Sequence, residues 1–272
     1  MIDLHVHSIY SDGSFSPSQL ISLCNQKGIN TISITDHDTI DAYVNMTIPK
    51  EYNVKVIPGI EFGLGHQDRC HILGYGFDLN SPIMKNACLT IKKHRLFEVL
   101  EIFRIIKKHN IEITVQDITS TYKTGLRLGN IIQELIRKGY AKDRNEVYDK
   151  FFRKEGKPCV TFYNYTPEEK INIIKKSNGK AILAHPYQLG LDKEKMEKKI
   201  VELINAGLDG LEIYHSGQEP ELEEFFLEMA DKYHLLITGG SDFHGIAKPS
   251  VKIGEIYGGR TLPDDVIEKL GW

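Results

Sequence analysis

Short apolar runs in the first third of the chain predict β-strands. They cover residues 2–7, 31–35, 54–60 and 70–75, and the first and last alternate apolar with polar positions, as half-buried strands do. Helix-length segments separate these runs. The best defined covers residues 17–27, with Ser16 as its N-cap and Gly28 as its stop. Strands that alternate with helices in this way are typical of parallel βα units.

The pattern becomes helical from Ser81 onward. Apolar residues recur there in steps of three and four, and the predicted helices cover a long segment from Ser81 and then residues 130–138 and 145–154, with no strand long enough to count. Near Thr166 the strand–helix rhythm returns, with predicted strands at residues 181–184, 210–214 and 235–238. We therefore expect an α/β barrel interrupted by a helical insertion, because neither half alone would close a sheet.

Composition narrows the class of protein. The 272 residues are 41% hydrophobic and carry a net charge of −3, which suits one substantial buried core. No apolar run approaches the roughly 18 residues that span a bilayer, and the N-terminus resembles a strand rather than a signal region, so we expect a cytoplasmic protein that does not contact membranes. The four cysteines are scattered, which favours reduced thiols over a disulfide scaffold.

Charge is unevenly distributed along the chain. Residues 85–157 hold 17 Lys and Arg against 9 Asp and Glu, so the rest of the chain is acidic. A basic segment of this kind suits capture of an anionic substrate, and it equally suits a solvated helical face.

Histidines on the first predicted strand give the first sign of chemistry. His5 and His7 are two residues apart, so both imidazoles point to one side of the strand. Asp12 follows in the turn Ser11-Asp12-Gly13, which can fold a carboxylate back over the strand end. By itself a His-x-His pair is weak evidence for a metal site, because a partly exposed strand pair has the same pattern.

The same residue types recur at the expected C-terminal ends of later strands. Counted together, they give nine candidate metal ligands, namely His5, His7, Asp12, His37, Glu61, His71, His185, Asp242 and His244. The strand ends of a parallel barrel converge on one rim, so these side chains should meet there. Without divalent cations such a cluster would be strongly unfavourable. The mixture of imidazole and carboxylate suits manganese, iron or zinc better than calcium or magnesium.

These motifs resemble those of the polymerase and histidinol phosphatase (PHP) superfamily. The matching segments, in the family's order, are Asp3-Leu4-His5-Val6-His7, Thr35-Asp36-His37-Asp38, Gly59-Ile60-Glu61, His71-Ile72-Leu73-Gly74-Tyr75, Ala184-His185-Pro186 and Gly240-Ser241-Asp242-Phe243-His244-Gly245. The resemblance implies a distorted (β/α)7 barrel at residues 1–77 and 163–272, interrupted at residues 78–162 by a helical insertion that forms a substrate-binding cap. It also implies a centre of three divalent metal ions, with Mn²⁺ expected and Fe²⁺ or Zn²⁺ as alternatives.

The resemblance further implies a distribution of the ligands among the three ions. His5, His7, Glu61 and Asp242 would surround the first ion, Glu61 would bridge to a second held by His71 and His185, and Asp12, His37 and His244 would hold the third. The residues expected to act in catalysis are His5, His7, Glu61, Asp242 and His244. Asp36 and Asp38 are interpreted as partners that orient the ligands or as helix-start carboxylates.

The expected reaction is hydrolysis of a phosphomonoester by metal-activated hydroxide. The sequence has no Gly-x-Ser-x-Gly elbow and no Walker-type phosphate loop, so a protein nucleophile is not expected. The insertion resembles that of the stand-alone bacterial PHP subgroup that acts on 3′,5′-nucleoside bisphosphates and short 5′-phosphorylated oligonucleotides. That subgroup carries Arg-x-His here, whereas this chain has Arg127-Leu128-Gly129-Asn130. The candidate substrate contacts are Arg127, Asn130, His215 and Lys248.

Other functions remain as alternatives. A histidinol-phosphate phosphatase or another small phosphomonoesterase would use the same ligands, and a non-catalytic metal-binding module, such as a polymerase carries, is a second possibility. An amidohydrolase that cleaves C–N bonds would be expected to carry a metal-bridging lysine at a strand end, and none is found. The expected partner is therefore a small phosphorylated molecule rather than long duplex nucleic acid.

Overall fold

A computed structural model describes residues 1–44, 46–63, 70–121, 126, 128–154, 157–158, 165–263 and 265–271. The chain divides into two compact units: the first comprises Met1–Cys88 and Tyr165–Trp272, and the second comprises Leu89–Asn164. Among the described residues, no helix combines the length and apolar character needed to cross a membrane.

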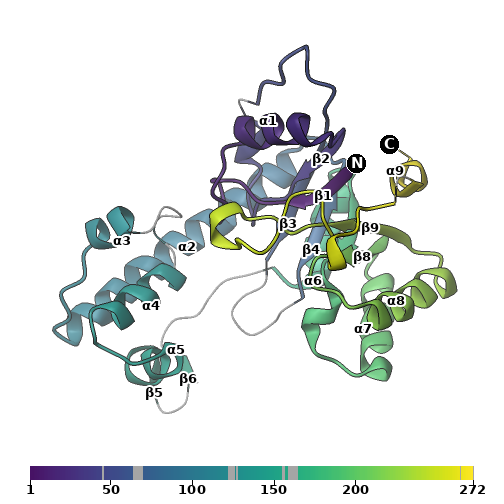
Figure 1. Cartoon of the computed structure of the whole chain (residues 1–272). Helices are drawn as coiled ribbons and strands as arrows, with labels where there is room; N and C mark the ends of the chain where they lie inside the picture. Colours follow the sequence, from purple (N-terminus) through teal and green to yellow (C-terminus); the bar gives the residue numbers. More distant parts are fainter. Residues whose placement is uncertain are drawn as a thin grey trace. The chain divides into compact units, whose positions relative to one another are not determined.

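The first unit is built on a seven-stranded sheet (Figure 1). In their order across the sheet, the strands are β1 (Ile2–Val6), β2 (Thr31–Ile34), β3 (Lys55–Phe62), β4 (Ile72–Tyr75), β7 (Lys180–Leu183), β8 (Gly210–His215) and β9 (Leu236–Gly240). Most pairs are parallel, but β4 runs antiparallel to both β3 and β7. The expectation of a parallel sheet throughout is therefore wrong at this one strand.

The sheet curls so that its last strand returns to its first. Beyond β9 the chain bonds to β1, with Asp242 N donating to His5 O and His7 N donating to Phe243 O, each at 2.9 Å. Gly240 permits this approach, since a Cβ at that position would lie 2.4 Å from His5 N. The result is a nearly closed, distorted barrel, which agrees with the fold that the sequence predicted.

Helices follow the strands of the barrel unit. They are α1 (Pro17–Lys27), α6 (Pro167–Lys176), α7 (Lys193–Asn205), α8 (Pro220–Lys232) and α9 (Asp265–Leu270). The predicted ends of α1 are confirmed, because Ser16 forms a capping box with Gln19 and Gly28 closes the helix in the left-handed conformation. Leu20, Ile21 and Cys24 of α1 are buried together with Ile32 and Ile34 of β2, forming part of the core on that side of the sheet.

The second unit is mainly helical. α2 (Pro82–Lys108) begins in the first unit and continues into the second from Leu89, where it is followed by α3 (Val115–Thr121), α4 (Leu128–Arg137) and α5 (Arg144–Val147). Its core includes Ile102, Ile131 and Leu135. The single helix expected at residues 145–154 is instead α5 followed by a π-helical turn at Tyr148–Phe152. The strands described in this unit, β5 (Arg153–Lys154) and β6 (Lys157–Pro158), have two residues each and pair with one another.

Candidate metal centre

All nine predicted ligands come together at one end of the barrel. Two of them lie inside strands, His5 in β1 and Glu61 in β3, and most of the others lie in the segments that follow β1, β2, β7 and β9. His71 is the exception, because it precedes β4. It joins the cluster because β4 runs antiparallel to β3, so that the start of β4 lies beside the end of β3.

Glu61 lies at the middle of the cluster, with its two oxygens facing different groups of imidazoles. Its Oε1 lies 2.6 Å from His71 Nδ1 and 2.9 Å from His185 Nε2. Its Oε2 lies 3.2 Å from the nearest nitrogen of each of His5, His7 and His37. The carboxylate is 1% exposed. This arrangement would allow one carboxylate to bridge two ions.

The spacing of four of these donor atoms fits a metal ion. His5 Nε2, His7 Nε2 and Glu61 Oε2 are each 3.2 Å from one another, and Asp242 Oδ1 lies 3.5 Å from the first and 3.3 Å from the second. Two ligand atoms bound to one ion at about 2.1 Å in tetrahedral geometry are themselves about 3.4 Å apart. These four atoms therefore have the chemistry and the separations of a coordination shell.

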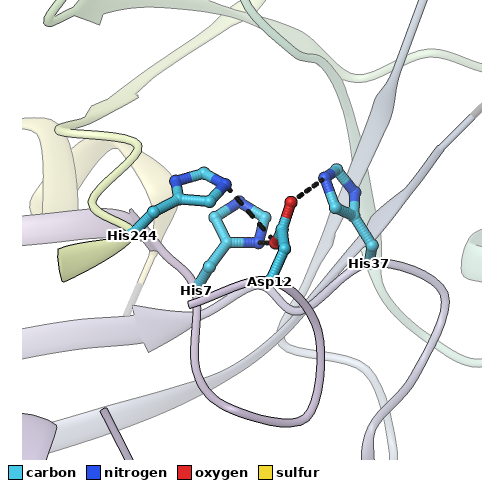
Figure 2. A group of neighbouring side chains, drawn as sticks. All are labelled: His7, Asp12, His37 and His244. Carbon is cyan, nitrogen blue, oxygen red and sulfur yellow. Dashed lines mark ion pairs between the residues drawn. The ribbon is translucent and has the colours of Figure 1, made fainter. Parts of the chain in front are cut away.

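A second group forms around Asp12 (Figure 2). Asp12 Oδ1 lies 3.3 Å from His7 Nδ1 and 3.4 Å from His244 Nε2, and Asp12 Oδ2 lies 3.6 Å from His37 Nε2. The carboxylate is one-third exposed, whereas His7 and His244 are buried. His7 lies between this group and the first, since its two ring nitrogens face opposite sides.

Electrostatics make the cluster a natural cation site. Burial alone would lower the pKa of His5, but Glu212 and Glu61 outweigh it and raise that pKa to about 10. Burial would raise the pKa of Glu61, Asp12 and Asp242, yet the surrounding imidazoles hold all three well below their ordinary values. Ionised carboxylates thus face nitrogens that must hold protons or bind metal ions.

Two of the imidazoles reinforce this conclusion. His37 Nδ1 lies 3.2 Å from Glu61 Oε2 without forming a hydrogen bond, and His185 faces Glu61 through Nε2 while its buried Nδ1 has no hydrogen-bond partner within the described ranges. Burial lowers the pKa of His37 to about 4 and also lowers that of His185, so both rings are neutral near pH 7. A neutral imidazole nitrogen is the form that binds a metal ion.

Carboxylates outside the predicted ligand set hold the ligands in place. Glu212 is fully buried; its Oε1 lies 2.7 Å from His5 Nδ1, and its Oε2 accepts from His185 N at 2.8 Å. Asp3 accepts from Ser241 N, Ser241 Oγ and Gly254 N, and so fixes the strand end that precedes Asp242. Neither residue was given a role from the sequence. The available signal was an acidic residue among the apolar positions of a predicted strand that in both cases has a histidine within it or directly after it.

Asp36 and Asp38 also orient neighbouring segments. Asp36 accepts from Ser8 N at 2.8 Å and from the hydroxyls of Ser8 and Ser11, and the Ser11 hydroxyl lies 3.2 Å from His7 Nδ1. Asp38 accepts from Gly63 N at 3.1 Å. These contacts connect the ends of β1, β2 and β3.

Three of the six described non-glycine residues with positive φ lie at the same rim. Asp38, His185 and Asp242 have φ values of 55°, 27° and 57°, in the region that favours glycine. Holding such residues there costs on the order of 1–3 kcal/mol each, so the surrounding structure must enforce the conformation. Glycine would adopt these backbone angles without strain, but it has no side chain to direct at the rim, whereas these residues supply two carboxylates and an imidazole there.

The predicted substrate contacts have different surroundings. Lys248 Nζ lies 2.6 Å from Asp242 Oδ2 and is 43% exposed, and His215 Nε2 lies 3.6 Å from the same oxygen and is 2% exposed. Asn130 lies in α4 of the second unit and is 9% exposed. Arg127 is outside the described residues.

Comparison with known proteins decides the family. The model of the PHP domain matches residues 3–238 of this chain. The chain belongs to the PHP family. This match, together with the donor cluster, makes it a metal-dependent phosphoesterase, the class that the sequence predicted.

Curated relatives in the PHP family differ in the reactions for which they are named. The chain is 27% identical to a 5′-3′ exoribonuclease of Haemophilus influenzae, covering 89% of each chain. It is also 27% identical to a phosphoribosyl 1,2-cyclic phosphate 1,2-diphosphodiesterase of Eggerthella lenta, covering 89% of this chain and 94% of that one. A 3′,5′-nucleoside bisphosphate phosphatase of Chromobacterium violaceum is 23% identical, covering 93% of this chain and 90% of that one.

Solved structures share the PHP fold. A metal-dependent phosphoesterase of Bifidobacterium adolescentis matches with a TM-score of 0.73 at 24% identity, covering 98% of this chain and 94% of that one. At this identity the likeness supports the fold alone.

Proposed function

We propose that this chain hydrolyses the phosphomonoester of a nucleotide, either a 3′,5′-nucleoside bisphosphate or a short 5′-phosphorylated oligonucleotide, at a centre of three divalent ions. The observation that carries the proposal is the divided environment of Glu61, whose oxygens face separate groups of imidazoles. Two relatives named for a nucleoside bisphosphate or for RNA support the substrate class.

The proposed ligands are the nine residues named from the sequence. His5, His7 and Asp242 with one oxygen of Glu61 would hold the first ion, His71 and His185 with the other oxygen would hold the second, and Asp12, His37 and His244 would hold the third. Mn²⁺ is the proposed metal, because borderline ions accept both imidazole and carboxylate ligands. Bound divalent ions would supply a nucleophile from water near neutral pH and would neutralise phosphoryl charge.

The chain's own residues would hold the ligands and the substrate. Glu212 and Asp36 orient the ligand-bearing strand ends, so that the donor atoms converge before substrate arrives. Lys248 is the proposed phosphate contact on the barrel, since its exposed ammonium already lies beside the centre. Arg127 and Asn130 are proposed as contacts from the helical unit, which would act as the substrate-binding cap.

Turnover of a substrate panel tests this proposal. The panel contains 3′,5′-bisphosphoadenosine, a 5′-phosphorylated dinucleotide, histidinol phosphate and phosphoribosyl 1,2-cyclic phosphate, each with Mn²⁺-loaded protein. Asp242→Asn removes a proposed ligand charge, and Asp231→Asn, an exposed aspartate on α8, is the matched control. We expect turnover of the bisphosphate or dinucleotide that Asp242→Asn abolishes and Asp231→Asn leaves unchanged. Turnover of histidinol phosphate alone would contradict the proposed substrate, and no metal-dependent turnover of any ester would contradict the proposed reaction.

A further inference from the structure

His215 is a buried histidine of the cluster to which the proposed metal centre gives no ligand role. It is the last residue of β8, and its side chain is 2% exposed. Its ring lies against those of His5, His185 and Tyr187, with ring centroids 5.4–6.1 Å apart. By position and burial alone it is a candidate for a tenth ligand, grouped with His5 and Glu212.

The Nδ1 atom of the His215 ring already accepts a hydrogen bond. Gly217 N donates to His215 Nδ1 at 2.9 Å, so Nδ1 carries no hydrogen. The turn that makes this bond is tightly packed, because a Cβ on Gly217 would lie 2.3 Å from the Tyr187 hydroxyl. An imidazolium, or the other neutral tautomer, would set two N–H groups against each other at this distance.

The Nε2 atom of His215 therefore carries the one N–H hydrogen of the neutral ring. A neutral imidazole has a single N–H, and with Nδ1 accepting, that hydrogen must be on Nε2. Nε2 is buried and has no hydrogen-bond partner among the described residues. A nitrogen that bears a hydrogen cannot also bind a metal ion, so the Gly217 amide excludes His215 from the ligand set.

Asp242 is the group that this N–H faces. Asp242 Oδ1 points to His5 and His7, whereas Asp242 Oδ2 lies 3.6 Å from His215 Nε2 and 2.6 Å from Lys248 Nζ. The 3.6 Å separation exceeds a hydrogen bond by roughly half an ångström, which a small shift of either side chain would close. Lys248 sits on a half-exposed flexible stem, whereas the histidine ring is held by its backbone bond.

We propose that His215 is a positioning residue. Its Nε2–H donates to Asp242 Oδ2 and so keeps Asp242 Oδ1 directed at the first metal ion. Lys248 shares Asp242 Oδ2 and leaves it when the ammonium engages a substrate phosphate. His215 then becomes the donor that maintains the carboxylate's orientation. This inference rests on the proposed metal centre and on Lys248 as the proposed phosphate contact, and it is independent of which phosphate ester is the substrate.

The first test reads the tautomer directly. Protein labelled with ¹⁵N at histidine is examined by long-range ¹H–¹⁵N correlation, without metal and after loading with Zn²⁺, which is diamagnetic; loss of signals in His215→Gln assigns the ring. We expect His215 to show a protonated Nε2 and an unprotonated Nδ1 in both states, while the rings of the proposed ligands shift with Zn²⁺. A hydrogen on Nδ1, or a zinc-induced shift of His215 Nε2 to the metal-bound range, would overturn the inference.

The second test measures metal binding without turnover. His215→Met removes the donor, whereas His215→Gln places an amide N–H near the position of Nε2. Mn²⁺ titration calorimetry should show about a 10–100-fold loss of affinity for the methionine variant, as is typical when an orienting partner is removed, with most of it restored in the glutamine variant. In an Asp242→Asn background, His215→Met should cause no further loss. Equal losses in both single variants, or additive losses in the double variant, would contradict the positioning role even if phosphatase activity were present.

Discussion

The hydroxyl of Tyr43 satisfies several backbone groups where the pairing of β2 and β3 is interrupted, before it resumes at His37 and Glu61. It donates to Ile34 O at 2.6 Å and accepts from Gly59 N at 2.8 Å and Ile34 N at 3.1 Å. Pro58 lies opposite Ile34 in the register and has no amide hydrogen to contribute to the ladder. Tyr43 therefore replaces ladder hydrogen bonds immediately before the segments that carry His37 and Glu61.

Tyr43→Phe removes these bonds without changing the shape of the ring. At about 1 kcal/mol net for each of the three bonds, the variant should lose about 3 kcal/mol in the free energy of unfolding. For a protein of this size, that corresponds to roughly 6–12 °C in Tm. Calorimetric melting in the presence of a chelator measures the loss without a contribution from metal binding.

A matched control separates this role from the general effect of losing a tyrosine hydroxyl. Tyr233 donates to the partly exposed Glu197 at 2.5 Å, so Tyr233→Phe should cost about 1 kcal/mol or less. If Tyr43→Phe melted within about 2 °C of the unmodified protein, the hydroxyl would not be replacing the ladder and the reasoning would be wrong.

Three further predictions concern the charges around the centre. The pKa of His5 in the metal-free protein is about 10, so Mn²⁺ must displace a proton when it binds. The apparent affinity for Mn²⁺ should therefore rise with pH, by up to about tenfold per pH unit below pH 10. Calorimetry in buffers of different ionisation enthalpy should detect the released proton. The Glu212 carboxylate contributes most to raising the pKa of His5, so in Glu212→Gln the Mn²⁺ affinity should depend less steeply on pH than in Glu228→Gln, an exposed control. Equal slopes in the two variants would contradict this. Lys170 is fully buried in α6 and donates to Gly63 O, so Lys170→Met should destabilise the barrel by roughly 1–3 kcal/mol in urea unfolding, and an unchanged midpoint would contradict that role.

Most helices and strands of the barrel were predicted correctly, because helix caps and alternating apolar positions depend on residues that are close in sequence. The N-cap at Ser16 and the left-handed Gly28 lie where the residue types indicated, and Thr166 forms a capping box of the same kind at the start of α6. Strand direction is different, because it depends on which strands pair. Nothing within residues 70–75 distinguishes a parallel from an antiparallel β4. His71 was thus expected after its strand and lies before it.

The ligand set was accessible from sequence, whereas its supporting residues were not. His and Asp at strand ends form a recognisable pattern, but Glu212 acts through contacts with His5 and His185, which are distant in sequence. The π-helical turn at Tyr148–Phe152 was also missed, because the helical spacing of its apolar residues is almost the same as in an α-helix.

The join between β9 and β1 has a consequence for synthesis of the chain. Its hydrogen bonds use the backbones of His5, His7 and Asp242, so the residues that close the barrel are the same residues proposed to bind the first ion. Contacts this distant in sequence form late, after most of the chain has been translated. A nascent chain that ends before His244 can acquire neither the final strand pairing nor the full donor set. Closure of the barrel and competence to take up metal should therefore arise together, as the last event of folding.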